Sequence, residues 1–332
     1  MFRWSDCTHV FVGHGLFAFA LAALVAERRG WPARRALALG VAAGPFAALP
    51  DVDVAYALIA IDGGRFLGGG SVRPDVFWTA ANSVHRSMTH SLLVAAVAGP
   101  ALGAWSSRRG VLRAVSLVVL VGVVGVAVAV SGLLGGIVMG AFVVAGVATA
   151  TACRRWAGLR PAVVGVAATA GLASHPWGDF LTGQPPQLFY PVDAGALGGR
   201  IVLHPDPTIH LLGAFAVELA VVWLAAIAVV RVTDRSWGAF YVPSALPGAA
   251  YSAAPLVLVP PTLEVSFHFV FSILGVGLVC AGVARYRAVP TPPGVATGVG
   301  GGDRRSWFDA GVAGVAGTTV ALVGYAAVYL AG

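Results

Sequence analysis

Histidine and aspartate residues gather in four short motifs of this 332-residue chain, and both side chains are common ligands of divalent metal ions. The motifs are VGHG, LPDVD, VHRSMTHS and SHPWGDFLT, and their candidate ligands are His14, Asp51, Asp53, His85, His90, His175 and Asp179. Imidazole combined with carboxylate favours zinc, or else manganese or iron, over magnesium alone. Because these ligands outnumber the four of a tetrahedral zinc, the sequence predicts a site for one or two divalent ions, most simply zinc.

The spacing within two motifs indicates how these ligands could meet. His175 and Asp179 are four residues apart, so on a helix they share a face and could reach one ion, provided that Pro176 begins a new turn. Asp51 and Asp53 are two apart and would point the same way in an extended stretch, where they could bridge two ions. In a two-ion scheme Asp53 is therefore a bridging ligand or a catalytic base.

The motif VHRSMTHS places an arginine beside two histidines. His85 and His90 are five apart and do not share a helical face, so we expect His85 to precede the helix on which His90 lies. Arg86 stays protonated and cannot bind a cation, but its guanidinium suits a phosphate oxygen, which makes it a candidate catalytic residue. Thr89 or Ser91 could cap the helix or orient a ligand.

The composition indicates what must position these residues. Hydrophobic residues make up 58% of the chain and charged residues 11%, against about 25% charged in soluble domains, so the fold class is an all-α, polytopic transmembrane bundle. We expect about ten spans, in the range 8–10, with the second broken at Pro50, a turn between the fourth and fifth at Ser131 and Gly132, and the eighth weakened by prolines. The candidate spans are 9–26, 36–61, 88–105, 111–131, 132–153, 161–178, 209–230, 243–261, 264–284 and 307–331.

Arginine placement sets the expected orientation. In this arrangement 16 of the 21 basic residues, all of them arginine, fall on one side, which the positive-inside rule makes cytoplasmic. All four motifs then lie at helix ends on the extracytoplasmic side of a prokaryotic cell membrane. The net charge of +7 comes from short arginine clusters between apolar segments, so no nucleic acid partner is expected.

The order of the motifs resembles the YdjM-type family of membrane-bound metal-dependent hydrolases. The resemblance covers about residues 10–191 and includes the stretch QPPQLFYP after the last motif. It implies a hydrolase that uses the metal ligands named above, without naming a substrate. We expect phosphoesters or lipid headgroups, with membrane lipids as partners. The alternatives are a transporter or metal-ion carrier that uses the same cluster, and a structural membrane protein with a stabilising metal.

The expected domain organisation has four parts. They are a metal-site domain over 1–208, additional transmembrane helices over 209–285, a Pro/Gly-rich linker over 286–306 and a C-terminal transmembrane helix over 307–332. Glu218, near the middle of a predicted span, could support the site or bond a neighbouring helix. The sequence leaves the oligomeric state open.

Overall fold

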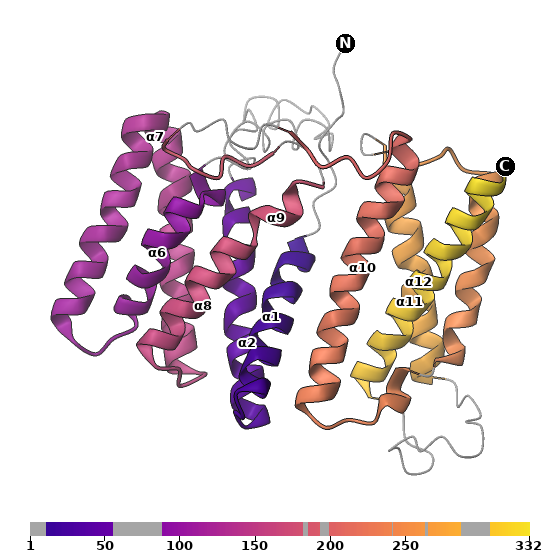
Figure 1. Ribbon diagram of the computed structural model, residues 1–332, viewed down its shortest axis with the longest axis horizontal. Coiled ribbons are helices and arrows are strands. Elements are labelled where there is room, and N and C mark those ends of the chain that lie inside the picture. Colours follow the sequence, from indigo (N-terminus) through magenta and orange to yellow (C-terminus); the bar gives the residue numbers. More distant parts are fainter. Residues whose placement is uncertain are drawn as a thin grey trace, which may run out of the picture. The chain divides into compact units, whose positions relative to one another are not determined.

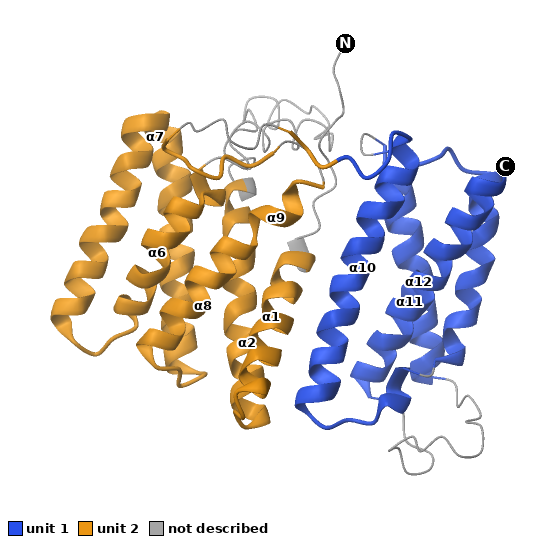
Figure 2. Ribbon diagram, in the orientation of Figure 1, with its two compact units in different colours: residues 1–8, 202–332 blue, residues 9–201 orange. Residues whose placement is uncertain are grey.

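A computed structural model describes residues 11–55, 88–181, 185–192, 199–240, 242–262, 265–286 and 306–332. The regular elements within these ranges are all helices, which confirms the predicted all-α class for this part of the chain (Figure 1). Two compact units make up the chain, an N-terminal unit of residues 9–201 and a C-terminal unit of residues 202–332 together with 1–8 (Figure 2).

The N-terminal unit contains all the described members of the four motifs. Its elements are α1 (Phe11–Arg28), α2 (Ala33–Ala48), η1 (Leu49–Ala55), η2 (Met88–His90), α6 (Leu92–Trp105), α7 (Gly110–Arg155), α8 (Pro161–Ser174) and α9 (Pro176–Asp179). The α-helix α2 gives way to the 3-10 helix η1 at Leu49, next to Pro50, where the sequence predicts a break. A proline lacks the N–H that would continue an α-helix, which explains the position of this change.

The C-terminal unit consists of α10 (Pro207–Val232), η3 (Trp237–Phe240), η4 (Pro243–Leu256), α11 (Phe267–Tyr286) and α12 (Trp307–Ala331). The long 3-10 helix η4 contains Pro247 and Pro255 and occupies most of the predicted eighth span. In α10 the side chain of Asp206 caps the first turn, and in α12 Ser306 and Asp309 form a reciprocal capping box. Most of the predicted linker lies outside the described residues.

Five helical segments in the described ranges are long and apolar enough to cross a membrane. They are Ala33–Asp53, Gly110–Arg155, Pro207–Val232, Phe267–Tyr286 and Trp307–Ala331. Gly132 has a φ of 72° and interrupts α7, as predicted, so that the helix on each side of it, about 33 and 35 Å long, exceeds the ~30 Å needed to span the hydrocarbon core. The total of about ten spans stays a prediction.

Glycines let α8 approach two neighbouring helices closely. A Cβ atom at Gly103 of α6 would lie 2.6 Å from the Cα of Gly165 in α8. A Cβ at Gly171 of α8 would lie 2.9 Å from both the carbonyl oxygen of Ala43 and the amide nitrogen of Ala47 in α2. Small residues permit such backbone contact between membrane helices, and here they bring the C-terminal end of α8 against the C-terminal end of α2.

Candidate metal centre

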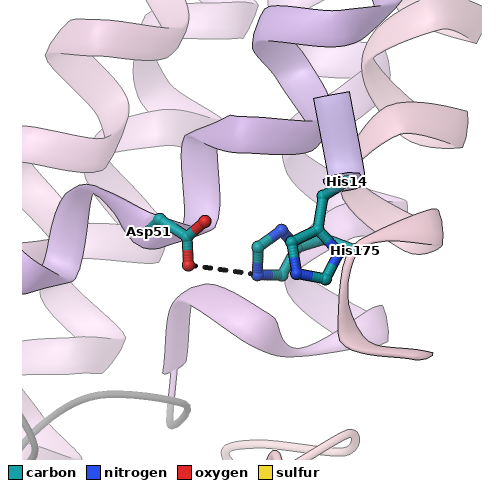
Figure 3. A group of neighbouring side chains, drawn as sticks. All are labelled: His14, Asp51 and His175. Carbon is teal, nitrogen blue, oxygen red and sulfur yellow. Dashed lines mark ion pairs between the residues drawn. The ribbon is translucent and has the colours of Figure 1, made fainter. Parts of the chain in front are cut away.

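Five side chains of the motifs meet at one end of the N-terminal unit. We call them the His/Asp cluster: His14, Asp51, His90, His175 and Asp179. They come from α1, η1, η2, the junction of α8 with α9, and the end of α9. Figure 3 shows three of them, with the carboxylate of Asp51 directed at the imidazole of His175 and the His14 ring beside it.

His175 is fixed by the way in which α2 ends. Its Nδ1 lies 2.6 Å from the carbonyl oxygen of Ala47, an acceptor to which Pro50, three residues further on, has no N–H to donate. The Nδ1–H of the imidazole donates to this carbonyl, so the lone pair of Nε2 points into the cluster. His175 lies between α8 and α9, and Pro176 begins the new turn, as the spacing of the last motif requires.

His90 is supported from behind by two buried side chains. The hydroxyl of Thr89 donates to Asp53 Oδ2 at 2.8 Å and lies 3.0 Å from His90 Nδ1. Since the one hydroxyl proton goes to the carboxylate, the hydroxyl oxygen can accept the Nδ1–H of His90. The second imidazole thereby also turns its Nε2 lone pair into the cluster, and Asp53 holds this arrangement through Thr89.

The two imidazole Nε2 atoms face each other, and a carboxylate oxygen lies close to each of them. His175 Nε2 lies 3.0 Å from His90 Nε2 and 3.4 Å from Asp51 Oδ1, and Asp179 Oδ2 lies 3.1 Å from His90 Nε2 and 3.5 Å from His175 Nε2. Ligand atoms at the corners of a tetrahedron around zinc are about 3.3 Å apart, given Zn–N bonds of ~2.0–2.1 Å. His90 Nε2, His175 Nε2 and Asp179 Oδ2, which lie 3.0–3.5 Å apart, therefore have the spacing of three ligands of a tetrahedral ion. Asp51 Oδ1 lies 3.4 Å from His175 Nε2 and 3.9 Å from His90 Nε2.

The close approach of these imidazole nitrogens and carboxylate oxygens favours a positive charge between them. Two facing nitrogen lone pairs and two carboxylates repel one another unless a proton or a metal cation lies between them. Among the described residues, Asp51 Oδ2 is buried and has no hydrogen-bond partner, which leaves it available to a cation. Burial of such groups in a membrane protein is costly, and pairing with a cation is the usual compensation.

His14 is the fifth potential metal ligand of the cluster. Its Nε2 lies 3.5 Å from Asp179 Oδ1, and its ring is centred 4.0 Å from that of His175. A Cβ atom at Gly178 would lie 2.5 Å from His14 Cε1, so the ring can occupy this place only next to a glycine. With 11% of its side chain exposed, His14 is the most accessible member of the cluster.

Two overlapping groups of three could each hold an ion, and within each group the donor atoms lie within 4.8 Å of one another. The groups are His14, Asp51 and His175, and His90, His175 and Asp179. Both need His175, whose one available nitrogen has a single lone pair and can serve only one ion. A second ion would therefore depend on the carboxylates, which can bridge.

The structure places the predicted site residues in three groups. Five form the cluster, whereas His85 and Arg86 lie outside the described residues. Asp53 lies on the Nδ1 side of His90, away from the converging atoms. The expected extended stretch is wrong: Asp51 and Asp53 lie in a 3-10 helix, where side chains two residues apart diverge by about 120° around the axis.

Ser91 connects the start of α6 to the segment 185–192 by hydrogen bonds. Of the two candidate caps, Ser91 is the one that caps α6: it accepts the N–H of Leu93 at 3.1 Å, and its hydroxyl donates to the carbonyl of Tyr190 at 2.8 Å. The Leu92 N–H also donates to the carbonyl of Leu188 at 2.8 Å. The segment 185–192, which follows the last motif, is thus bound to the start of α6.

The carbonyl of Ala47 is the functional group that sequence reasoning missed. A backbone oxygen has no signature of its own in a sequence, but Pro50 was a usable signal, because in a 3-10 turn residue 50 would donate its N–H to the Ala47 carbonyl and a proline has none.

Comparison with known proteins extends the resemblance beyond the motifs. The model of the YdjM inner membrane protein family matches residues 10–252, which is more than half of the chain and reaches through α10 into η4. Neither the curated proteins nor the solved structures gave a match. With five helical segments able to span a membrane and a buried His/Asp cluster, the chain belongs to the YdjM inner membrane protein family.

Proposed function

We propose that the protein is a metal-dependent hydrolase that acts on phosphoesters, in particular lipid headgroups, at the extracytoplasmic face of the membrane. The spacing of His90 Nε2, His175 Nε2 and Asp179 Oδ2, with Asp51 Oδ1 beside His175, supports this proposal. A bound divalent ion supplies Lewis-acid polarisation of the scissile group and a more acidic water at neutral pH.

Different residues bind the metal ion, orient its ligands and bind the substrate. Asp51, His90, His175 and Asp179 hold the ion, and the Ala47 carbonyl and Thr89 keep the two imidazoles in the tautomer that binds metal. His14, on the accessible side of the cluster, is placed to bind a second ion or to hold a proton near the substrate. Arg86 is proposed to bind the anionic oxygen of the phosphoester.

Metal content and turnover measured on the same preparations test this function. Purified wild-type protein is expected to hold about one to two equivalents of zinc, manganese or iron and to hydrolyse bis(p-nitrophenyl) phosphate or a labelled phospholipid. His175→Ala and Asp179→Ala should lose at least about half of the metal, since each removes a ligand. The matched control is His204→Ala, an exposed histidine of the C-terminal unit. Unchanged metal content in both ligand variants would exclude this cluster as the metal site.

Transport of a metal ion is the second candidate, and it is favoured by the interrupted helices. The helix α2 gives way to a 3-10 helix at Leu49, and α8 ends at Ser174 before α9 begins. Both interruptions lie next to cluster residues. Transporters often bind their cargo at such discontinuities. Metal uptake by proteoliposomes without ester turnover would favour this function, and turnover without uptake would favour the hydrolase.

A further inference from the structure

Two arginines of the N-terminal unit meet at a single backbone oxygen just past the end of α6. The Nε–H of Arg113, in the first turn of α7, donates to the carbonyl of Ser107 at 2.8 Å, and Nη1 of Arg154, in the last turn of α7, donates to the same oxygen at 3.1 Å. The two donor nitrogens therefore lie within about 6 Å of each other, where like charges repel. We propose that these two side chains, the Ser107 arginine pair, bind the phosphate of an anionic phospholipid at a site separate from the His/Asp cluster.

Hydrogen bonds to the end of α6 explain where the two arginines lie but leave most of their charge uncompensated. Ser107 follows Ser106, the C-cap of α6, and the C-terminal end of a helix carries roughly half of a negative charge. The pair carries two full positive charges and about five N–H donors on each guanidinium. Apart from a 3.3 Å bond from Arg113 to the Trp105 carbonyl, neither side chain makes a further hydrogen bond or ion pair with the described part of the chain. Most of the donors are therefore available to a ligand.

The chain around the pair supplies no carboxylate to balance it. Residues 76–178 contain no aspartate or glutamate, whereas residues 106–160 include six arginines. The helix α7 begins beside the pair without a side-chain cap and without an acidic residue in its first turn, so the positive end of its dipole adds to the charge. This end of the unit therefore attracts an anion that the surrounding chain does not provide.

Two tryptophans indicate that this anion is a lipid headgroup. Trp156 is 83% exposed and follows Arg155, and Trp105 lies two residues before Ser107, with its Nε1–H donating to Thr151 at 3.1 Å. Tryptophan is enriched at the level of the headgroups, and the long stems of arginines hold their guanidinium groups at the same level. A phosphodiester has two non-ester oxygens, so each guanidinium can donate to one of them. A headgroup with a net negative charge is preferred, because a choline would add another cation to this end.

Charge-matched substitutions in the full-length protein test the site. Arg113→Gln and Arg154→Gln each remove one member of the pair. Arg155→Gln removes the same charge from the neighbouring residue, which in the described structure donates no hydrogen bond to the Ser107 carbonyl. Native mass spectrometry of the detergent-solubilised protein, titrated with dioleoyl phosphatidylglycerol or dioleoyl phosphatidylcholine, measures the lipid affinity. Inorganic phosphate is added as a competitor, and thermal unfolding in lipid-free detergent measures the stability.

We expect phosphatidylglycerol to bind more tightly than phosphatidylcholine. Arg113→Gln and Arg154→Gln should each weaken phosphatidylglycerol binding roughly tenfold, because each removes a charge-assisted hydrogen bond. Arg155→Gln should stay within about twofold of the wild type, since an exposed charge outside the contact is screened. Arg113→Lys keeps the charge but cannot hold the carbonyl and the phosphate with separate edges, so it should lose about threefold, and it decides the question if a glutamine variant does not fold.

Three results would overturn the proposal. Equal weakening in all three glutamine variants would mean that general surface charge attracts the lipid. Glutamine variants of the pair that lose thermal stability but bind phosphatidylglycerol like the wild type would show that the arginines only cap α6. Displacement of the lipid by inorganic phosphate at similar concentrations would make a free anion, and not a headgroup, the ligand. None of these results depends on turnover at the His/Asp cluster.

Discussion

Replacing Gly171 by alanine should weaken metal binding through a displacement of one helix. The added Cβ would lie 2.9 Å from Ala43 O and Ala47 N of α2, whereas ordinary contacts begin at 3.4 Å. The end of α8 must therefore withdraw by at least about 0.5 Å, a distance set by van der Waals repulsion. His175 lies one turn further along on the same side, so its 2.6 Å hydrogen bond to the Ala47 carbonyl would lengthen beyond about 3 Å and lose most of its orienting effect.

The magnitudes separate an effect on the site from an effect on folding. Overpacking costs roughly 1–3 kcal/mol, but alanine gains about 1 kcal/mol over glycine in a helix, so the net loss of stability is about 0–2 kcal/mol. Loss of a residue that orients a metal ligand costs roughly 10–100-fold in metal affinity. Titration of the purified protein with zinc against a competing chelator measures the affinity, and thermal unfolding of the metal-free protein measures the stability.

A glycine in an open place provides the matched control. A Cβ atom added at Gly122 of α7 would meet no atom of a neighbouring element within 4 Å. Gly122→Ala should therefore leave metal affinity at the wild-type value and raise stability by up to about 1 kcal/mol. Wild-type zinc affinity in folded Gly171→Ala would refute the idea that close α2–α8 packing sets the position of His175.

Three further predictions concern the support, the substrate and the orientation. Asp53→Asn should lower metal affinity roughly 10–100-fold without removing an ion, because it weakens the acceptor behind Thr89; complete loss of one equivalent would instead make Asp53 a ligand, as its sequence motif suggests. Arg86→Ala should keep its metal while kcat/KM for a phosphodiester falls by roughly 2–4 kcal/mol of transition-state stabilisation, and metal loss in this variant would contradict substrate binding. A cysteine at exposed Gly199 should react with an impermeant maleimide in intact cells, and one at exposed Ala157 only after lysis, with the reverse pattern overturning the proposed orientation.

Local chemistry explains which features could be predicted from the sequence. The break after α2 and the interruption of α7 at Gly132 depend on the proline or glycine present at each point, so they could be located without a structure. The cap of α6 could be narrowed to Thr89 or Ser91, and the structure selects Ser91. Because successive transmembrane helices run in opposite directions, the sequence also predicted that the motif histidines and aspartates gather at one end.

Other features depend on contacts between distant segments and could not be predicted. The difference in facing between Asp51 and Asp53 follows from the 3-10 form of η1, which the motif LPDVD does not specify. The choice of imidazole nitrogen depends on Ala47, which lies 128 positions from His175.

Pro50 lowers the stability of the α2 backbone but keeps the metal-site residues in position. If a residue with an N–H replaced it, that N–H, three residues after Ala47, would compete for the Ala47 carbonyl that His175 uses. Such a change would add regular backbone bonds while depriving the imidazole of its anchor and rotating Asp51 away from it. Selection for heat resistance alone would therefore favour Pro50→Ala, whereas selection for function would keep the proline, so the interruption of α2 is stability given up to hold the site in shape.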